Sequence, residues 1–213
     1  MIKVFFLIFE PGVAWEKIAQ ARRGFAFITV VHLLPFILAG TALESWGLER
    51  HGKWQPRFQF LKAFTTPEII TYETIQVLML LAVVFVSAVL IYKISQTFQD
   101  RLTFLQAFTT VAYGFSPLFL LHFLDAGAMV HPAVPWMLGI AMVIWILYQG
   151  IPRVMQPDPT HAFGIYLSAM IVVILTSFLA RLITGLYLLG YIDLEHSWAA
   201  HRIDQWFPHQ HLP

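Results

Sequence analysis

Residues 163–190 read FGIYLSAMIVVILTSFLARLITGLYLLG, a run in which Arg181 is the single charged side chain. A transmembrane helix needs about 20 mostly apolar residues, because its backbone polar groups find no water inside a hydrocarbon core of roughly 30 Å. This run is longer than that minimum. It therefore predicts a membrane-spanning helix with enough length to tilt or to extend beyond the bilayer.

Four earlier runs meet the same requirement for length and polarity. They cover about residues 24–43, 75–94, 105–124 and 133–151. Together with residues 163–190 they predict an all-α integral membrane bundle of five transmembrane helices.

The composition agrees with a membrane protein and excludes several other classes. Hydrophobic residues make up 58% of the chain and charged residues only 12%, against roughly half and about a quarter in an average soluble protein. The chain has no Cys, which excludes a disulfide, a thiolate nucleophile and a cysteine-based metal site. A net charge of +1 provides no electrostatic surface for nucleic acid.

Two shorter segments flank the predicted membrane domain of residues 24–190. In residues 1–23, Pro11 suits the first turn of a short helix whose apolar side carries Trp15 and Ile18. We expect this helix to lie in the membrane interface or, alternatively, to pack on the bundle. Residues 191–213 form a His-rich tail that we expect to be amphipathic. The predicted interfacial anchors are Trp15, Trp198 and Trp206.

The distribution of basic residues predicts the orientation. With the N-terminus in the cytoplasm, seven Lys and Arg residues lie inside and five lie outside, Arg181 being left out because it is within a span. The positive-inside rule therefore favours a cytoplasmic N-terminus and an external C-terminus.

Short motifs interrupt or end the last three spans. The sequence YGFSP (113–117) breaks the third span, YQGIP (148–152) closes the fourth, and MQP (155–157) leads towards the fifth. Near the N-terminus, FEP (9–11) precedes Trp15. The residues that we single out in these motifs are Tyr113, Gly114, Ser116, Pro117, Tyr148, Gly150, Pro152 and Pro157.

The order and spacing of these motifs against five spans resemble the Yip-domain family of Ypt- or Rab-interacting membrane proteins, and in particular its bacterial branch. The resemblance covers about residues 5–190 and implies a compact five-helix membrane domain in a bacterial inner membrane. Eukaryotic members are linked to Rab GTPases and vesicle trafficking, but this sequence lacks their long polar N-terminal region. The resemblance implies no catalytic residue and no cofactor.

The motifs also have a physical interpretation of their own. Pro117 removes a backbone donor and breaks the third helix, while Ser116 can satisfy a carbonyl that the break sets free. Broken helices line binding sites in some transporters, but a kink required for packing is the simpler interpretation. Pro152 and Pro157 are expected to stop the fourth helix, and Gly114 to allow close helix approach.

Arg181 is the clearest ionisable residue inside a span, where such a charge costs roughly 2.5–3.5 kcal/mol on insertion scales. In the predicted orientation Glu44 ends the first span and Asp125 ends the third on the same side. We expect Arg181 to form an ion pair with one of them or to snorkel outward. Binding of a lipid phosphate and participation in transport are alternatives.

Histidine is concentrated towards the external side in this orientation. Imidazoles together with Asp125 could bind zinc or copper, although their spacing matches no established site. The candidate ligands are His122, His131, His196, His201, His209 and His211. His32, inside the first span, could in principle ligate haem, but a hydrogen-bonded packing residue is the more common role.

Three functions remain open at this level. The leading one is a non-enzymatic membrane scaffold or accessory subunit that associates with lipids or a partner protein. The second is a small transporter that uses the broken third helix, which predicts a hydrated cavity at Ser116. The third is a metal- or haem-binding subunit. No phosphate-binding glycine loop, metalloprotease helix or credible serine nucleophile suggests an enzyme.

Overall fold

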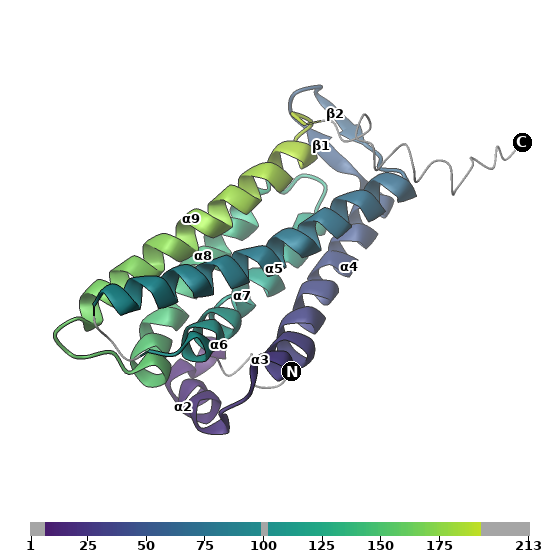
Figure 1. Cartoon of the computed structure of the whole chain (residues 1–213). Helices are drawn as coiled ribbons and strands as arrows, with labels where there is room; N and C mark the ends of the chain where they lie inside the picture. The colour runs from purple at the N-terminus through teal and green to yellow at the C-terminus, as the bar shows by residue number, and fades with distance from the viewer. Residues whose placement is uncertain (1–6, 99–101, 193–213) are drawn as a thin grey trace, which may run out of the picture.

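The computed structural model describes residues 7–98 and 102–192. Within them, five helical segments are long and apolar enough to cross a membrane, as predicted (Figure 1). The first contains α3 (Phe25–Phe27), the π-helical stretch η1 (Ile28–Leu33) and α4 (Leu34–His51), and the second is α5 (Thr66–Thr97). The third contains α6 (Phe104–Gly114), α7 (Ser116–Leu121) and the 3₁₀ turn η2 (His122–Ala126). The fourth is α8 (Ala133–Gly150) with the π-helical η3 (Ile151–Met155), and the fifth is α9 (Ala162–Leu188).

The third span lies at the centre of the bundle. Of its most apolar stretch 78% is buried, against 33–44% for the other four spans. Phe108, Phe115 and Phe119 project from it and are almost completely buried. Because lipid tails are as apolar as these side chains, close packing rather than transfer from water holds such a core together.

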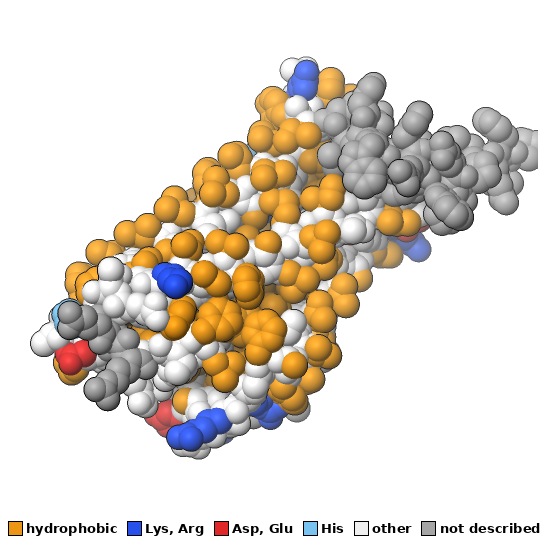
Figure 2. Space-filling view, viewed as in Figure 1, with side chains coloured by type: hydrophobic (Ala, Val, Ile, Leu, Met, Phe, Trp, Pro, Cys, Tyr) orange, Lys and Arg blue, Asp and Glu red, His pale blue; other side chains and the backbone are white. Residues whose placement is uncertain are grey.

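The outer surface of the bundle is apolar along its length. Figure 2 shows hydrophobic side chains covering the visible side, with charged side chains gathered mainly near its two ends. Large exposed apolar residues occur on several spans, for example Leu78, Met137 and Leu179. This surface fits contact with lipid chains rather than with water.

The break in the third helix occurs where the sequence predicted it. Helix α6 ends at Gly114 and α7 begins at Ser116, with Pro117 in its first turn. The fourth helix differs from the expectation, because it does not stop at Pro152. It continues as a π-helical turn through Met155 and ends where Gln156 adopts φ 48°, directly before Pro157. The change from α-helical to π-helical spacing at Ile151 coincides with Pro152, which interrupts the α-helical hydrogen-bond ladder.

The short N-terminal helix α2 (Pro11–Ala21) begins at Pro11 as predicted, but its tryptophan is placed differently. Trp15 is completely buried, and its indole N–H donates a hydrogen bond to the carbonyl of Ile146 at 3.0 Å. Trp15 therefore fixes α2 to the bundle and does not serve as an interfacial anchor. Trp198 and Trp206 lie outside the described residues.

A small β-hairpin between the first two spans was not predicted. Strands β1 (Lys53–Gln55) and β2 (Phe60–Lys62) pair antiparallel, with Trp54 opposite Leu61. The Trp54 N–H also donates to the carbonyl of Ala128 at 3.0 Å, so the hairpin is attached to the loop after the third span. It closes the end of the bundle that lies opposite α2 (Figure 1).

Candidate functional site

Ionisable and polar side chains from five elements meet inside the bundle, at the end that the hairpin covers. Their burial is unusual, since charged groups inside a membrane domain are costly unless paired. The cluster contains Glu44 of α4, Lys53 of β1, Tyr72, Glu73 and Gln76 of α5, His122 and Asp125 of η2, and Arg181 of α9. We refer to these eight residues as the ionic cluster.

Arg181 and Asp125 form the ion pair of this cluster. The Nη2 of Arg181 donates to Oδ1 of Asp125 at 2.6 Å, and Arg181 is only 9% exposed. Nε and Nη2 of Arg181 also donate to the carbonyl of Pro132, at 2.9 and 2.6 Å. Of the two carboxylates expected near this guanidinium, Asp125 thus contacts it directly.

Glu44 is held by two side chains of α5. Tyr72 donates its hydroxyl hydrogen to Oε1 of Glu44 at 2.9 Å, and Gln76 donates from Nε2 to Oε2. Glu44 is completely buried. These neutral donors take the place of water around its carboxylate, which is what a buried acidic group requires.

His122 lies between the two acidic residues. Its Nδ1 is 3.2 Å from Oδ2 of Asp125 and 3.5 Å from Oε2 of Glu44. The residue is placed there because η2 is a tight 3₁₀ turn, which brings residues three apart onto the same side. Neither Nδ1 of His122 nor Oδ2 of Asp125 makes a hydrogen bond in the described structure, although both are buried.

Lys53 enters the cluster from the hairpin. Its ammonium donates to the carbonyls of Asp125 and Gly127, at 2.7 and 3.0 Å, and the residue is only 1% exposed. Burial lowers the pKa of Lys53 below its usual value, an effect that Asp125 and Glu44 oppose. Lys53, which lies between the first two predicted spans in the sequence, therefore binds the backbone of η2 and of the loop that follows it.

A third carboxylate borders the cluster. Glu73, 8% exposed, accepts a hydrogen bond on Oε1 from Ser45 at 3.0 Å, while its buried Oε2 makes none in the described structure. The cluster thus brings together three carboxyl groups, one guanidinium, one ammonium and the imidazole of His122.

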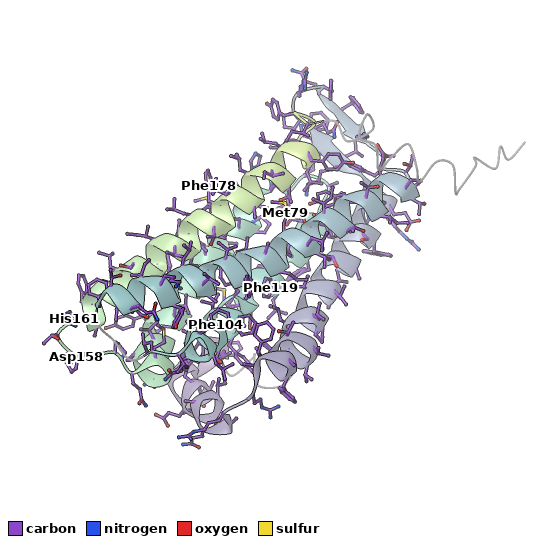
Figure 3. The ribbon with its side chains drawn as sticks, in the orientation of Figure 1. Met79, Phe104, Phe119, Asp158, His161 and Phe178 are labelled. Atoms are coloured by element: carbon purple, nitrogen blue, oxygen red, sulfur yellow. The ribbon has the colours of Figure 1, made fainter. Side chains whose placement is uncertain are left out.

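A narrow crevice leads into the cluster between α5, α8 and α9. It encloses about 440 Å³ of empty space, including the part that is open at the surface. Apolar side chains such as Met79 of α5 line its sides, and His122, Asp125 and Arg181 lie along its wall (Figure 3 labels Met79). An imidazole, a carboxylate and a guanidinium are therefore reachable from one side of the bundle.

The break in the third helix lies away from this crevice and is fully packed. Ser116 is completely buried, donates to the carbonyl of Tyr113 at 2.7 Å and lies 3.1 Å from Nε2 of His32. His32 stacks on the ring of Tyr113, with centroids 4.0 Å apart. His32 is thus a hydrogen-bonded packing residue, as favoured from the sequence.

The remaining motif residues contribute to helix contacts. A Cβ at Gly114 would come within 2.5 Å of the Leu147 side chain, and one at Gly150 within 2.5 Å of Trp15. Tyr148 is exposed, with its ring edge against Tyr166. These residues shape the packing of the bundle and lie outside the ionic cluster.

Of the two predicted metal-ligating histidines that the structure describes, one belongs to the cluster. His122 faces two carboxylates, whereas Nδ1 of His131 accepts a hydrogen bond from the backbone of Ala133 at 3.2 Å. The other four candidates, His196, His201, His209 and His211, lie outside the described residues.

Sequence reasoning missed half of the cluster. Tyr72 and Glu73 precede the predicted start of the second span, Gln76 stands near that start, and Lys53 was assigned to an exposed loop. The spacing of Tyr72, Glu73 and Gln76 could have indicated their position. If the second helix is extended towards its N-terminus, these three residues fall on one face, and that face can point into the bundle.

Four apolar helices around a buried third span, with the buried charged groups of the described residues gathered at one end, define a multi-pass α-helical membrane protein. The family model of the Yip1 domain matches residues 5–181. The chain therefore belongs to the Yip1 domain family, as the motifs of the third to fifth spans predicted. Comparison with curated proteins and with solved structures found no match.

Proposed function

We propose that the protein is a non-enzymatic membrane scaffold or accessory subunit, which acts through lateral packing of its helices with lipids or a partner protein. The observation that carries this proposal is the closed break in the third helix. Ser116 and Pro117 are completely or almost completely buried within the core, and Ser116 has hydrogen-bonding neighbours of its own. A packed core of this kind supports a role for the outer surface rather than for a passage through the bundle.

We further propose that the protein resides in a bacterial inner membrane with its N-terminus in the cytoplasm. Membership of the Yip1 domain family supports the membrane location, and the excess of basic residues on the α2 side supports the orientation. Its association with lipids is supported by the exposed apolar residues of α5, α8 and α9.

Site-specific photo-crosslinking in native membranes tests the scaffold proposal. A photoreactive residue is placed at Leu78, Met137 or Leu179, which are 62, 61 and 59% exposed on three different helices. The buried Phe119 provides the matched control position. If the protein is a scaffold, at least one of these three positions is expected to crosslink reproducibly to one partner protein or to a second copy of this chain. Lipid adducts alone from all three positions would contradict association with a protein partner.

A second measurement separates the scaffold from a transporter. The crevice that reaches Asp125 and Arg181 is the specific observation that favours transport. Proteoliposomes containing the purified protein are expected to show no ion flux above that of empty vesicles. Flux that is lost in Asp125→Asn but retained in the exposed-loop variant Asp158→Asn would favour the transporter instead.

A further inference from the structure

We propose that Glu44, His122 and Asp125 form a binding site for a divalent transition-metal cation, and that Zn²⁺ is the ion which suits it best. Each residue offers one ligand atom, and the three atoms lie within 4.8 Å of one another. The proposal concerns the ionic cluster and does not depend on the scaffold function.

The two distances from the imidazole nitrogen to the carboxylate oxygens agree with a tetrahedral site. Zinc binds imidazole nitrogen at about 2.0–2.1 Å and carboxylate oxygen at about 2.0–2.2 Å, so ligand atoms of a tetrahedral site are about 3.3–3.5 Å apart. Nδ1 of His122 lies 3.2 Å from Oδ2 of Asp125 and 3.5 Å from Oε2 of Glu44. Small side-chain movements would therefore centre an ion between them.

A second, independent observation is that two of these atoms lack hydrogen bonds. Nδ1 of His122 and Oδ2 of Asp125 are buried and have no hydrogen-bond partner in the described structure. The His122 side chain is only 9% exposed and that of Asp125 is completely buried. A buried polar atom without a partner is costly. A metal ion held between these two atoms, which lie 3.2 Å apart, would satisfy both at once.

The surrounding residues hold the two carboxylate ligands in place through hydrogen bonds. Arg181 binds Oδ1 of Asp125, which leaves Oδ2 for an ion. Tyr72 donates to Oε1 of Glu44, and Gln76 donates to Oε2. Hydrogen bonds of this kind orient ligating carboxylates and tune their affinity for the metal.

The donor set also suits a divalent transition-metal cation. One imidazole with two carboxylates is a nitrogen and oxygen donor set that suits Zn²⁺ and neighbouring first-row metals. A proton held between His122 and the two carboxylates is the competing explanation. The crevice lies beside His122 and Asp125.

The test uses the full-length protein, purified through a tag without histidine, stripped with a chelator and dialysed against Zn²⁺. Bound zinc is measured by mass spectrometry, and Co²⁺ replaces it as a spectroscopic probe of coordination. Because the tail could bind metal itself, all variants are made in a background where His196, His201, His209 and His211 are changed to Gln. His122→Gln is compared with His131→Gln, which serves as the matched control.

We expect one equivalent of zinc and a tetrahedral cobalt spectrum in the tail-substituted protein and in His131→Gln, and loss of both in His122→Gln. If His122→Gln does not fold, Tyr72→Phe provides the second test, since it keeps all three ligands. Loss of the hydrogen bond from Tyr72 to Glu44 is expected to weaken zinc binding about 10–100-fold. Absence of stoichiometric zinc in the tail-substituted protein would overturn the proposal in favour of a proton. Zinc binding that survives in His122→Gln, or is unchanged in Tyr72→Phe, would overturn it as well.

Discussion

At the scale of single residues, burial of a charge inside the bundle requires several partners at once. Arg181 satisfies this through Asp125 and the carbonyl of Pro132, and Asp125 in turn lies beside His122. In an environment of low dielectric, each charged group offsets part of the cost of burying its neighbour. The cluster therefore behaves as a unit, and removal of one member leaves the others without compensation.

Arg181→Leu is expected to destabilise the protein severely. It would leave the buried carboxylate of Asp125 and the carbonyl of Pro132 unpaired, and loss of one partner of a buried ion pair costs about 3–5 kcal/mol. Thermal unfolding in detergent, followed by tryptophan fluorescence, measures the change.

Arg153→Leu is the matched control for this substitution. Arg153 is about one-third exposed and lies 3.9 Å from the exposed Glu16, and such surface pairs contribute little. We expect a change within about 0.5 kcal/mol. Equal effects of the two arginine substitutions would contradict a buried pair at Arg181 and support an outward-directed side chain.

The sequence predicted Arg181, Asp125 and Glu44 as neighbours because each is a charge at the same end of an apolar run. It could not predict Lys53, since hydropathy does not tell whether a charged loop residue folds back onto the bundle. That placement depends on the hairpin and on the backbone carbonyls of Asp125 and Gly127. Tertiary contacts of this kind leave no periodic signal in the chain.

At the scale of secondary structure elements, two similar stretches adopt different structures. Residues 57–66 (RFQFLKAFTT) and 101–110 (RLTFLQAFTT) share seven of ten residues. Phe60–Lys62 nevertheless forms strand β2, whereas the equivalent residues 104–106 begin helix α6. The second stretch has Thr103 as a helix cap where the first has Gln59, which adopts φ 56° in the hairpin turn. Local capping and turn geometry, more than the shared apolar pattern, decide between the two outcomes.

Thr103→Ala is accordingly expected to destabilise α6 by about 1 kcal/mol. The Thr103 hydroxyl accepts a hydrogen bond from the Gln106 N–H at 3.3 Å, and Gln106 Oε1 accepts one from the Thr103 N–H in return. Thr97→Ala, at an exposed position near the end of α5, should change the stability by less than about 0.5 kcal/mol. The comparison uses the unfolding midpoint of both variants, and an equal effect would argue against the capping role.

Gly150→Ala tests how α2 is attached to the bundle. A Cβ at this position would lie 2.5 Å from the Trp15 ring, so the indole has to move away from its hydrogen bond to Ile146. Overpacking of this kind costs about 1–3 kcal/mol, and we expect faster proteolysis within α2. Gly24→Ala is the control, because nothing lies within 4 Å of the added Cβ. Unchanged proteolysis in Gly150→Ala would show that Trp15 does not hold α2 in place.

At the scale of the whole molecule, the five spans follow from hydropathy, because a bilayer restricts spanning segments to apolar helices. The two ends differ in ways that hydropathy alone does not reveal. One end carries α2 and the loop with Asp158, whose pKa is lowered by hydrogen bonds from Thr160. The other end carries the hairpin and the ionic cluster (Figure 1, with Asp158 labelled in Figure 3).

This difference bears on the expected orientation. Lys53 is buried in the cluster and is not a surface charge, so among the described residues three basic residues remain on the hairpin side against five on the α2 side. We therefore still expect α2 and Asp158 in the cytoplasm. Because the chain has no Cys, single-cysteine variants can be labelled selectively. We expect a membrane-impermeant maleimide to label Arg50→Cys in intact spheroplasts, and Asp158→Cys only after the membrane is permeabilised. Labelling of Asp158→Cys in intact spheroplasts with protection of Arg50→Cys would reverse the orientation and place the ionic cluster at the cytoplasmic end.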